Sequence, residues 1–165
     1  MNFKKILLAV LATVMMMAAP LSAEDNDVVK VVYPLDFPDV KRVHFMLNTL
    51  NNLVKHYQKN FIDYELSIVV YGPGLQYAMH DFKGTGFAGK PYLTHGGPTG
   101  KGTHGRIHAL KQLAGDNLRM FVCENTMKKK NVKANQLHPF TEVTPGGVLK
   151  LIELQGEGAA LIKIR

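Results

Sequence analysis

The stretch LRMFVCENT, Leu118–Thr126, decides the fold that we expect for this chain. Its apolar first half predicts a short buried strand, and Cys123, the only cysteine of the 165 residues, stands at the end of that strand. Glu124, Asn125 and Thr126 follow at once and suit the first turn of a helix. A strand that passes directly into a helix places Cys123 at the helix N-terminus, where backbone N–H groups and the helix dipole lower a thiol pKa. Cys123 is therefore the candidate catalytic residue, and the alternative is a buried, unreactive cysteine.

Strands and helices alternate on both sides of this stretch. The β-branched run Val28–Tyr33 predicts a first strand, which Pro34 ends. A long helix is predicted from Pro38 to about Lys59, because apolar residues there recur at alternating spacings of three and four. The other strands are predicted at Asp63–Tyr71, Leu118–Val122, Phe140–Val143 and Ala159–Ile164, and the other helices at Leu75–Met79, Gly105–Ala114, Glu124–Lys130 and Pro145–Leu154. This alternation indicates an α/β fold: a single compact domain with a central, mostly parallel sheet of about five strands and helices on both faces.

Two of the predicted helices carry more apolar residues than are required for packing along a single helix face. In the first long helix, Phe45, Met46 and Leu53 widen the apolar stripe, which favours burial against the sheet and against another subunit. In the last helix we expect four apolar residues to turn inward, namely Val148, Leu151, Ile152 and Leu154.

The loops after parallel strands gather at one edge of a sheet, and ligands normally bind there. Four segments are expected to meet at this edge: Pro34–Asp36, Gly72–Gly74, Cys123–Thr126 and Thr144–Gly147. The candidate substrate-binding residues are Gly72, Gly74, Asn125 and Thr126, whose backbone N–H groups and side chains can hold an anion. The alternative is that these residues only satisfy the geometry of the turns.

The segment Asp81–Arg106 contains eight glycines and two prolines in 26 residues, which predicts a long loop without a core of its own. Its histidines make a second candidate site, because imidazole is a common ligand of zinc, copper and nickel. His104 and His108 are spaced to face one side of a starting helix, and His95 is the third candidate ligand. No HExxH or CxxC pattern accompanies them. We therefore expect no cofactor, with a divalent metal as the alternative.

Residues 1–23 have the order of a secretory signal peptide: two lysines, an apolar stretch, and small residues up to Ala23. The apolar stretch is short for a membrane span, so we expect cleavage after Ala23 and a mature domain of residues 24–165. This predicts a periplasmic or otherwise exported protein without stable membrane insertion after cleavage. An uncleaved anchor is the alternative, because Leu21 stands where a smaller residue is usual.

The net charge and the single cysteine limit the kinds of binding partner that we expect. Loss of the two N-terminal lysines lowers the formal net charge from +7 to +5, and lysines cluster after the cysteine at positions 128–130 and 133. Such a cluster attracts small anions or acidic partners, although it is more often a solvated face. Nucleic-acid binding is not expected for an exported chain without a matching motif. One cysteine cannot form an internal disulfide, so it is buried, reactive or paired with another chain.

Three stretches of the sequence together resemble the DsrE/DsrF-like family, in particular its exported branch. They are the Gly-Pro-Gly after the second strand, VCENTMK, and VTPGGVLKLIELQGEG. The resemblance implies a compact α/β fold with a central parallel sheet, assembly into homotrimers or homohexamers, and a role in sulfur oxidation or sulfur relay. In relay members, a cysteine at the position of Cys123 carries sulfur as a persulfide. The implied partners are a protein that donates or accepts sulfane sulfur, or a small anion.

Three functions follow from these features. The first is a sulfur carrier or sulfurtransferase that forms a persulfide on Cys123. The second is a non-catalytic oligomeric binding module that keeps the fold without the chemistry. The third is a metal-binding protein that uses the histidine-containing loop.

Overall fold

The computed structural model describes residues 28–89 and 102–165 of the chain. The predicted signal peptide, residues 1–23, and the candidate ligand His95 lie outside the described residues. Within the described ranges, no helix has the length and apolar character that crossing a membrane requires.

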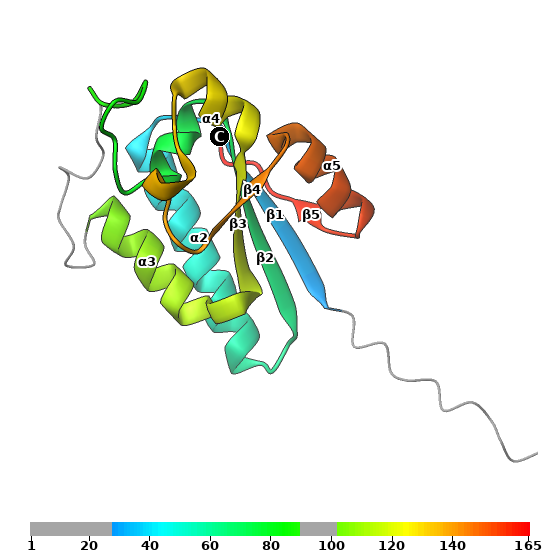
Figure 1. Cartoon of the computed structure of the whole chain (residues 1–165). Coiled ribbons are helices and arrows are strands. Elements are labelled where there is room, and N and C mark those ends of the chain that lie inside the picture. Colours follow the sequence, from blue (N-terminus) through cyan, green and yellow to red (C-terminus); the bar gives the residue numbers. More distant parts are fainter. Residues whose placement is uncertain (1–27, 90–101) are drawn as a thin grey trace, which may run out of the picture.

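The chain forms one α/β domain around a five-stranded sheet with the order β4-β3-β2-β1-β5 (Figure 1). Every neighbouring pair of strands is parallel, which confirms the predicted fold class. The strands are β1 (Val29–Leu35), β2 (Tyr64–Val70), β3 (Leu118–Cys123), β4 (Thr141–Thr144) and β5 (Ala160–Leu161). The α-helices are α2 (Val40–Lys59), α3 (Thr103–Ala114), α4 (Glu124–Lys130) and α5 (Gly147–Gly156), and short 3₁₀ helices are η2 (Gly72–Ala78), η4 (Gly115–Asn117) and η5 (Ala134–Gln136).

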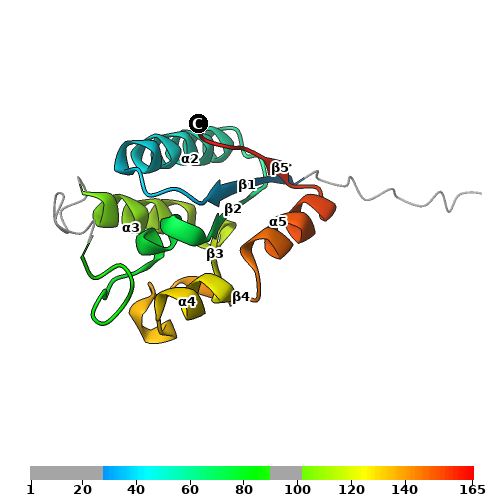
Figure 2. The same ribbon diagram turned by 90° about the horizontal axis from the view of Figure 1, so that it is seen from above.

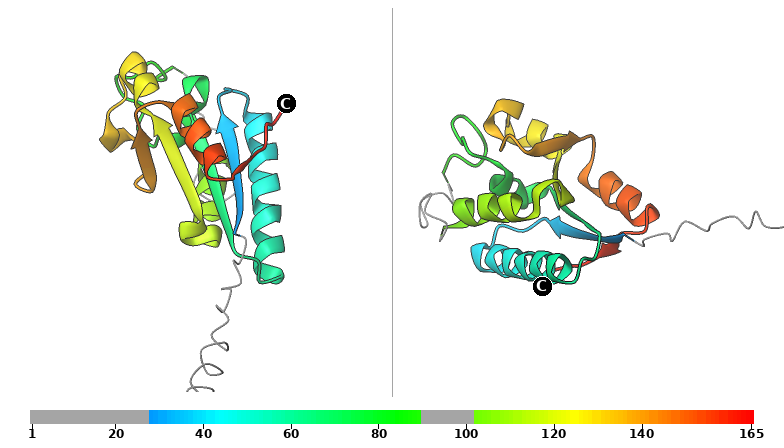
Figure 3. Two further views of the ribbon diagram at one scale, coloured as in Figure 1. Left: turned by 90° about the vertical axis from the view of Figure 1, so that its right-hand side faces the viewer. Right: turned by 90° about the horizontal axis from the view of Figure 1, so that it is seen from below.

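Helices cover both faces of the sheet, as predicted. Figures 2 and 3 show α2 and α3 on one face and α5 on the other. Successive strand residues point to opposite faces, so Tyr33 joins the large core under α2 and α3, whereas Val32 joins the smaller core under α5. Asp39 begins α2, and its carboxylate accepts the backbone N–H of Arg42 at 2.7 Å.

Some of the extra apolar residues of the two helices are exposed in the single chain. Met46 is buried in α2, but Phe45 is 57% exposed, because it lies about 200° around the helix from the buried Val43. In α5 the side chains that face the sheet are buried, namely Leu151 and Leu154. Val148 and Ile152 were predicted to turn inward and are instead exposed, by 59% and 62%. They lie on a neighbouring face of α5 that does not pack against the sheet.

Two strands at the β5 end of the sheet have other boundaries than predicted. Pro34 lies inside β1, because its missing N–H faces the side of the short β5, which has already ended. Only Ala160–Leu161 of the predicted last strand pairs with the sheet. The chain then crosses to the other face, where Ile164 is buried in the large core and its carbonyl accepts a hydrogen bond from Arg42 at 2.5 Å.

The described parts of the glycine-rich segment, 81–89 and 102–106, are packed against the domain. The helix after β2 is a 3₁₀ helix that begins at Gly72, and α3 already begins at Thr103. Phe82 and Phe87, which the prediction placed in a loop without a core, are buried in the large core. These two aromatic rings, together with a hydrogen bond from the Gly86 N–H to the Lys130 carbonyl at 2.8 Å, hold this part of the segment against the domain.

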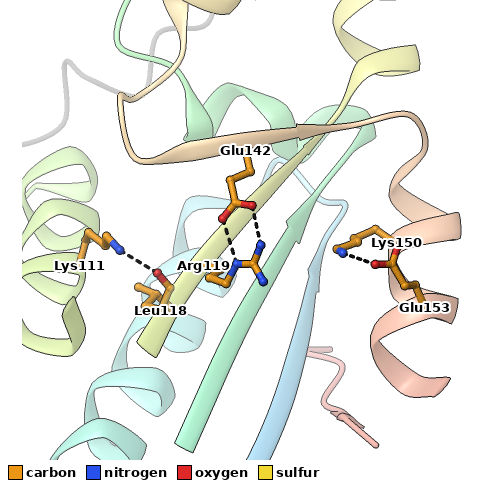
Figure 4. A network of polar contacts seen from close by, with 6 residues as sticks. All are labelled: Lys111, Leu118, Arg119, Glu142, Lys150 and Glu153. Atoms are coloured by element: carbon orange, nitrogen blue, oxygen red, sulfur yellow. Dashed lines mark hydrogen bonds and ion pairs between the residues drawn. The ribbon is translucent and has the colours of Figure 1, made fainter. Parts of the chain in front are cut away.

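Polar contacts hold the edge strand β4 and the start of α5 (Figure 4). Arg119 of β3 donates two hydrogen bonds to the Glu142 carboxylate of β4, at 2.9 and 2.6 Å, and these bonds hold the pKa of that carboxyl below its ordinary value. Lys150 of α5 pairs with Glu153 at 2.5 Å and lies over the Phe121 ring, at 4.5 Å from its centroid. The charged side chains thus cover the part of β3 that α5 leaves open.

Candidate functional site

Cys123 ends β3 and is the N-cap residue of α4, as its sequence context predicts. In the parallel ladder it lies opposite Thr144 of β4. The side chain is buried, with 6% of its surface exposed. The sulfur therefore lies at the ligand-binding edge of the sheet, close below the surface.

The four segments predicted to meet at this edge do meet around Cys123. Gly74 lies against the backbone of Leu35, so closely that an added Cβ would be 2.1 Å from the Leu35 carbonyl oxygen, which joins the first two segments. The backbone N–H of Gly72 donates to the Thr126 hydroxyl oxygen at 3.0 Å, which joins the second and third. The backbone of Gly147 is hydrogen-bonded to Cys123 and brings in the fourth.

Hydrogen-bond donors from three residues surround the thiol sulfur. Burial raises the pKa of the Cys123 thiol. Hydrogen bonds from the Thr126 hydroxyl and from the backbone N–H groups of Gly147, Thr126 and Asn125 outweigh that effect, so the pKa lies below the ordinary value. A thiolate is the form of cysteine that attacks sulfur, so this environment favours nucleophilic chemistry.

Thr126 links Cys123 to the loop after β2. Its oxygen accepts the N–H of Gly72, which leaves the hydroxyl hydrogen directed to the sulfur of Cys123. Gly72 has a φ of +53°, a conformation that glycine adopts without strain. Gly72 therefore supports the site through Thr126.

The remaining predicted residues at this edge divide between the site and the fold. Asn125 contributes its backbone N–H to the sulfur. Gly74 is buried, donates its N–H to the Tyr71 carbonyl at 3.2 Å, and packs against the backbone of Leu35. The carboxylate of Glu124, next to the cysteine, forms an ion pair with Lys128 at 2.9 Å.

The predicted metal ligands His104 and His108 lie together on α3, with ring centroids 4.3 Å apart. The structure adds His138, whose ring centroid is 4.9 Å from each of the other two. Burial lowers the pKa of His104 and of His108. Burial and then repulsion from the neighbouring histidines lower the pKa of His138 to about 3, so the rings are neutral near neutral pH.

The comparison with protein families decides the relationship. The sequence profile described as the DsrE/DsrF-like family matches residues 15–164. The chain belongs to the DsrE/DsrF-like family. This family is associated with sulfur relay. Among solved structures, a protein of unknown function from Methanobacterium thermoautotrophicum is similar to this chain with a TM-score of 0.60 and 21% identity, over 82% of this chain and 98% of that one. In the comparison with curated proteins, nothing matches this sequence.

The site of this DsrE/DsrF-like protein includes a residue, Gly147, that the sequence placed at this edge but did not single out as a candidate site residue. Gly147 begins α5 and donates its N–H to the cysteine, and a Cβ at this position would lie 2.9 Å from the Tyr71 side chain. Only glycine therefore allows this close approach. The signal was present in the TPGG stretch after β4, but nothing local distinguishes this glycine from a turn residue.

A pocket of about 780 Å³ opens beside the cysteine site of the DsrE/DsrF-like domain. Its lining includes Gly72 and Thr126 from the site, Phe87 from the glycine-rich segment, and Lys129 and Lys130 of α4. The lysines place positive charge at the pocket, which suits an anionic ligand.

Proposed function

We propose that this protein is an exported sulfur carrier, with sulfurtransferase-type chemistry, that forms a persulfide on Cys123. The observation that carries the proposal is the set of four hydrogen bonds to the thiol sulfur, from Thr126, Asn125 and Gly147. A persulfide anion has the same need for donors as a thiolate, so the groups that lower the pKa of the thiol also stabilise the loaded form.

The chemistry requires one displacement at sulfur. The Cys123 thiolate attacks the outer sulfur of a donor such as thiosulfate or a polysulfide. A bond forms between Sγ and that sulfur, and the S–S bond of the donor breaks. With thiosulfate the electron pair leaves on sulfite, and Cys123 becomes a persulfide anion. Attack by an acceptor thiolate on the outer persulfide sulfur reverses the bonding and returns the Cys123 thiolate.

The pocket beside the site supports a small anionic donor. Thr126 contacts both the pocket and the sulfur of Cys123, and Lys129 and Lys130 supply positive charge at the pocket. A protein partner with a negatively charged surface is favoured by the same lysines. We propose a sulfane-sulfur donor or acceptor protein as the second type of partner.

Mass spectrometry of the purified protein tests the function. After incubation with thiosulfate or polysulfide, we expect one or more added sulfur atoms on the Cys123 peptide, removal by reductant, and no addition to Cys123→Ser. No addition to the wild type, together with a thiol that reacts only after unfolding, would contradict the carrier and leave a non-catalytic binding module. The same spectra of exported protein test secretion, because cleavage after Ala23 gives a mature chain that begins at Glu24.

We also propose that the protein assembles with itself, into a homotrimer or homohexamer, through α5. The side chains Val148, Leu149 and Ile152 of this helix are 59%, 64% and 62% exposed. Contiguous exposed apolar side chains are typical of protein–protein interfaces.

The double substitution Leu149→Lys with Ile152→Lys is expected to yield monomers, because it places charge in an apolar interface. Sedimentation velocity measures the change. Phe61→Lys is the matched control, since Phe61 is 95% exposed after α2, and it should leave the oligomer intact. A wild-type protein that sediments as a monomer would argue against self-assembly, and a double variant that keeps its oligomer would move the interface away from α5.

A further inference from the structure

Three imidazole rings from two distant parts of the chain lie close together. Two are on α3, and the third is in the segment that precedes β4. His104 and His108 lie one turn apart on α3, so they face the same side of that helix. His138 comes from the segment between η5 and β4. One nitrogen from each ring lies within 4.8 Å of the other two.

The spacing of these nitrogens suits a bound metal ion. In a tetrahedral site, Zn–N bonds of about 2.0–2.1 Å place the ligand nitrogens roughly 3.4 Å apart. Nε2 of His108 and Nδ1 of His138 are 3.4 Å apart. The other nitrogens are at most 4.8 Å apart, so small rotations of the side chains bring them to bonding distance.

One nitrogen in the cluster has an unmet need for a partner. Nδ1 of His104 is buried and has no hydrogen-bond partner among the described residues. A buried polar atom without a partner costs about 1–3 kcal/mol. A metal ion at the centre of the cluster would give such a nitrogen an electron-pair acceptor.

His138 is held in place before any ion binds. Its side chain is buried, with 1% exposure, and its ring is hydrogen-bonded to the backbone of Tyr77. Phe140 stacks on the ring at 5.3 Å between centroids and 12° between planes. A hydrogen bond between one ring nitrogen and the backbone commonly orients a metal-binding histidine and leaves the other ring nitrogen for the ion.

We propose that His104, His108 and His138 form a binding site for one divalent transition-metal ion per chain. Within the described residues, the cluster supplies nitrogen donors only, which favours zinc, copper or nickel over calcium or magnesium. Three protein ligands leave a fourth position for water or a small ligand. The site is separate from the proposed sulfur chemistry, because the hydrogen bonds to the Cys123 sulfur come from Thr126, Asn125 and Gly147.

Metal titration tests the site. Protein purified without a polyhistidine tag and stripped with a chelator is titrated with Zn²⁺ by calorimetry and with Co²⁺ by visible spectroscopy. We expect one ion per chain and the visible bands of tetrahedral, nitrogen-bound Co²⁺. His104→Gln and His108→Gln each weaken Zn²⁺ binding by about tenfold or more, because each removes one of three ligands. Both residues are partly exposed, so these variants avoid the fully buried His138, and their melting temperatures check that they fold.

Two control variants give the experiment its power. His56→Gln changes an exposed histidine at the end of α2 and should bind Zn²⁺ as the wild type does. Cys123→Ser should also bind normally, which separates this site from the sulfur carrier. The proposal is overturned if the wild type binds no ion at micromolar Zn²⁺, if folded His104→Gln and His108→Gln variants keep full affinity, or if Cys123→Ser loses the ion.

Discussion

Gly74→Ala is expected to lower the free energy of unfolding by about 3 kcal/mol or more, which makes it one of the two largest effects that we predict. The added Cβ would lie 2.1 Å from the carbonyl oxygen and 2.6 Å from the carbonyl carbon of Leu35. Both are backbone atoms, so no side-chain rotation relieves the contact. That carbonyl also accepts the N–H of Tyr71 at 3.1 Å, and the clash therefore separates the end of β1 from the loop after β2.

Urea unfolding followed by circular dichroism measures this loss. Gly156→Ala is the matched control, because a Cβ at the end of α5 meets nothing within 4 Å. Alanine also favours the helical conformation more than glycine does, so this variant should be as stable as the wild type or slightly more stable. A Gly74→Ala protein that unfolds at the wild-type urea concentration would show that the two loops do not approach so closely.

Thr126→Val is expected to slow alkylation of Cys123 near neutral pH by about tenfold or more. The substitution removes the hydroxyl that donates to the sulfur, and a hydrogen bond to a charged group contributes about 1.5–3 kcal/mol. The pKa of the thiol therefore rises, and a smaller fraction is thiolate at a given pH. Rates with a small alkylating reagent, measured from acidic to alkaline pH, report this change.

The wild type sets the reference for the pH profile. Because the pKa of Cys123 is lowered in the folded protein, the alkylation rate should reach half its maximum at a lower pH than it does for an ordinary cysteine thiol. The same shift stabilises the fold above the unfolded-state pKa, and that contribution is lost as the pH falls through the folded-state pKa.

Thr126→Ser is the matched control, because it keeps both the donor to the sulfur and the acceptor for the N–H of Gly72. Its profile should match the wild type. A Thr126→Val variant with an unchanged profile would indicate that the backbone N–H groups alone set the pKa. A wild-type midpoint at or above the ordinary value would mean that burial outweighs the hydrogen bonds.

The fold could be predicted largely from the sequence, since its signals are local. The period of α2 and the β-branched composition of β1 and β2 are properties of neighbouring residues. The position of Cys123 was predictable for the same reason, because β3 passes into α4 without an intervening loop. The prediction that Pro34 ends the first strand was wrong, because β1 continues to Leu35. Whether a proline fits inside a strand depends on which strand lies alongside, and the neighbouring residues in the sequence do not determine that.

The sequence by itself determined an α/β chain with one cysteine at a strand-to-helix junction, because hydrophobic period and helix-start residues act over a few positions. Only the tertiary structure decided what surrounds that cysteine and the histidines. Gly147 reaches Cys123, and His138 reaches His104, through parallel strands and helices that bring distant segments together. The tertiary structure also decided that Ile152 is exposed on the single chain. The sheet covers only one side of α5, and the helical period alone does not determine which side that is. Contacts between distant residues arise from packing, and packing is fixed only when the whole chain has folded.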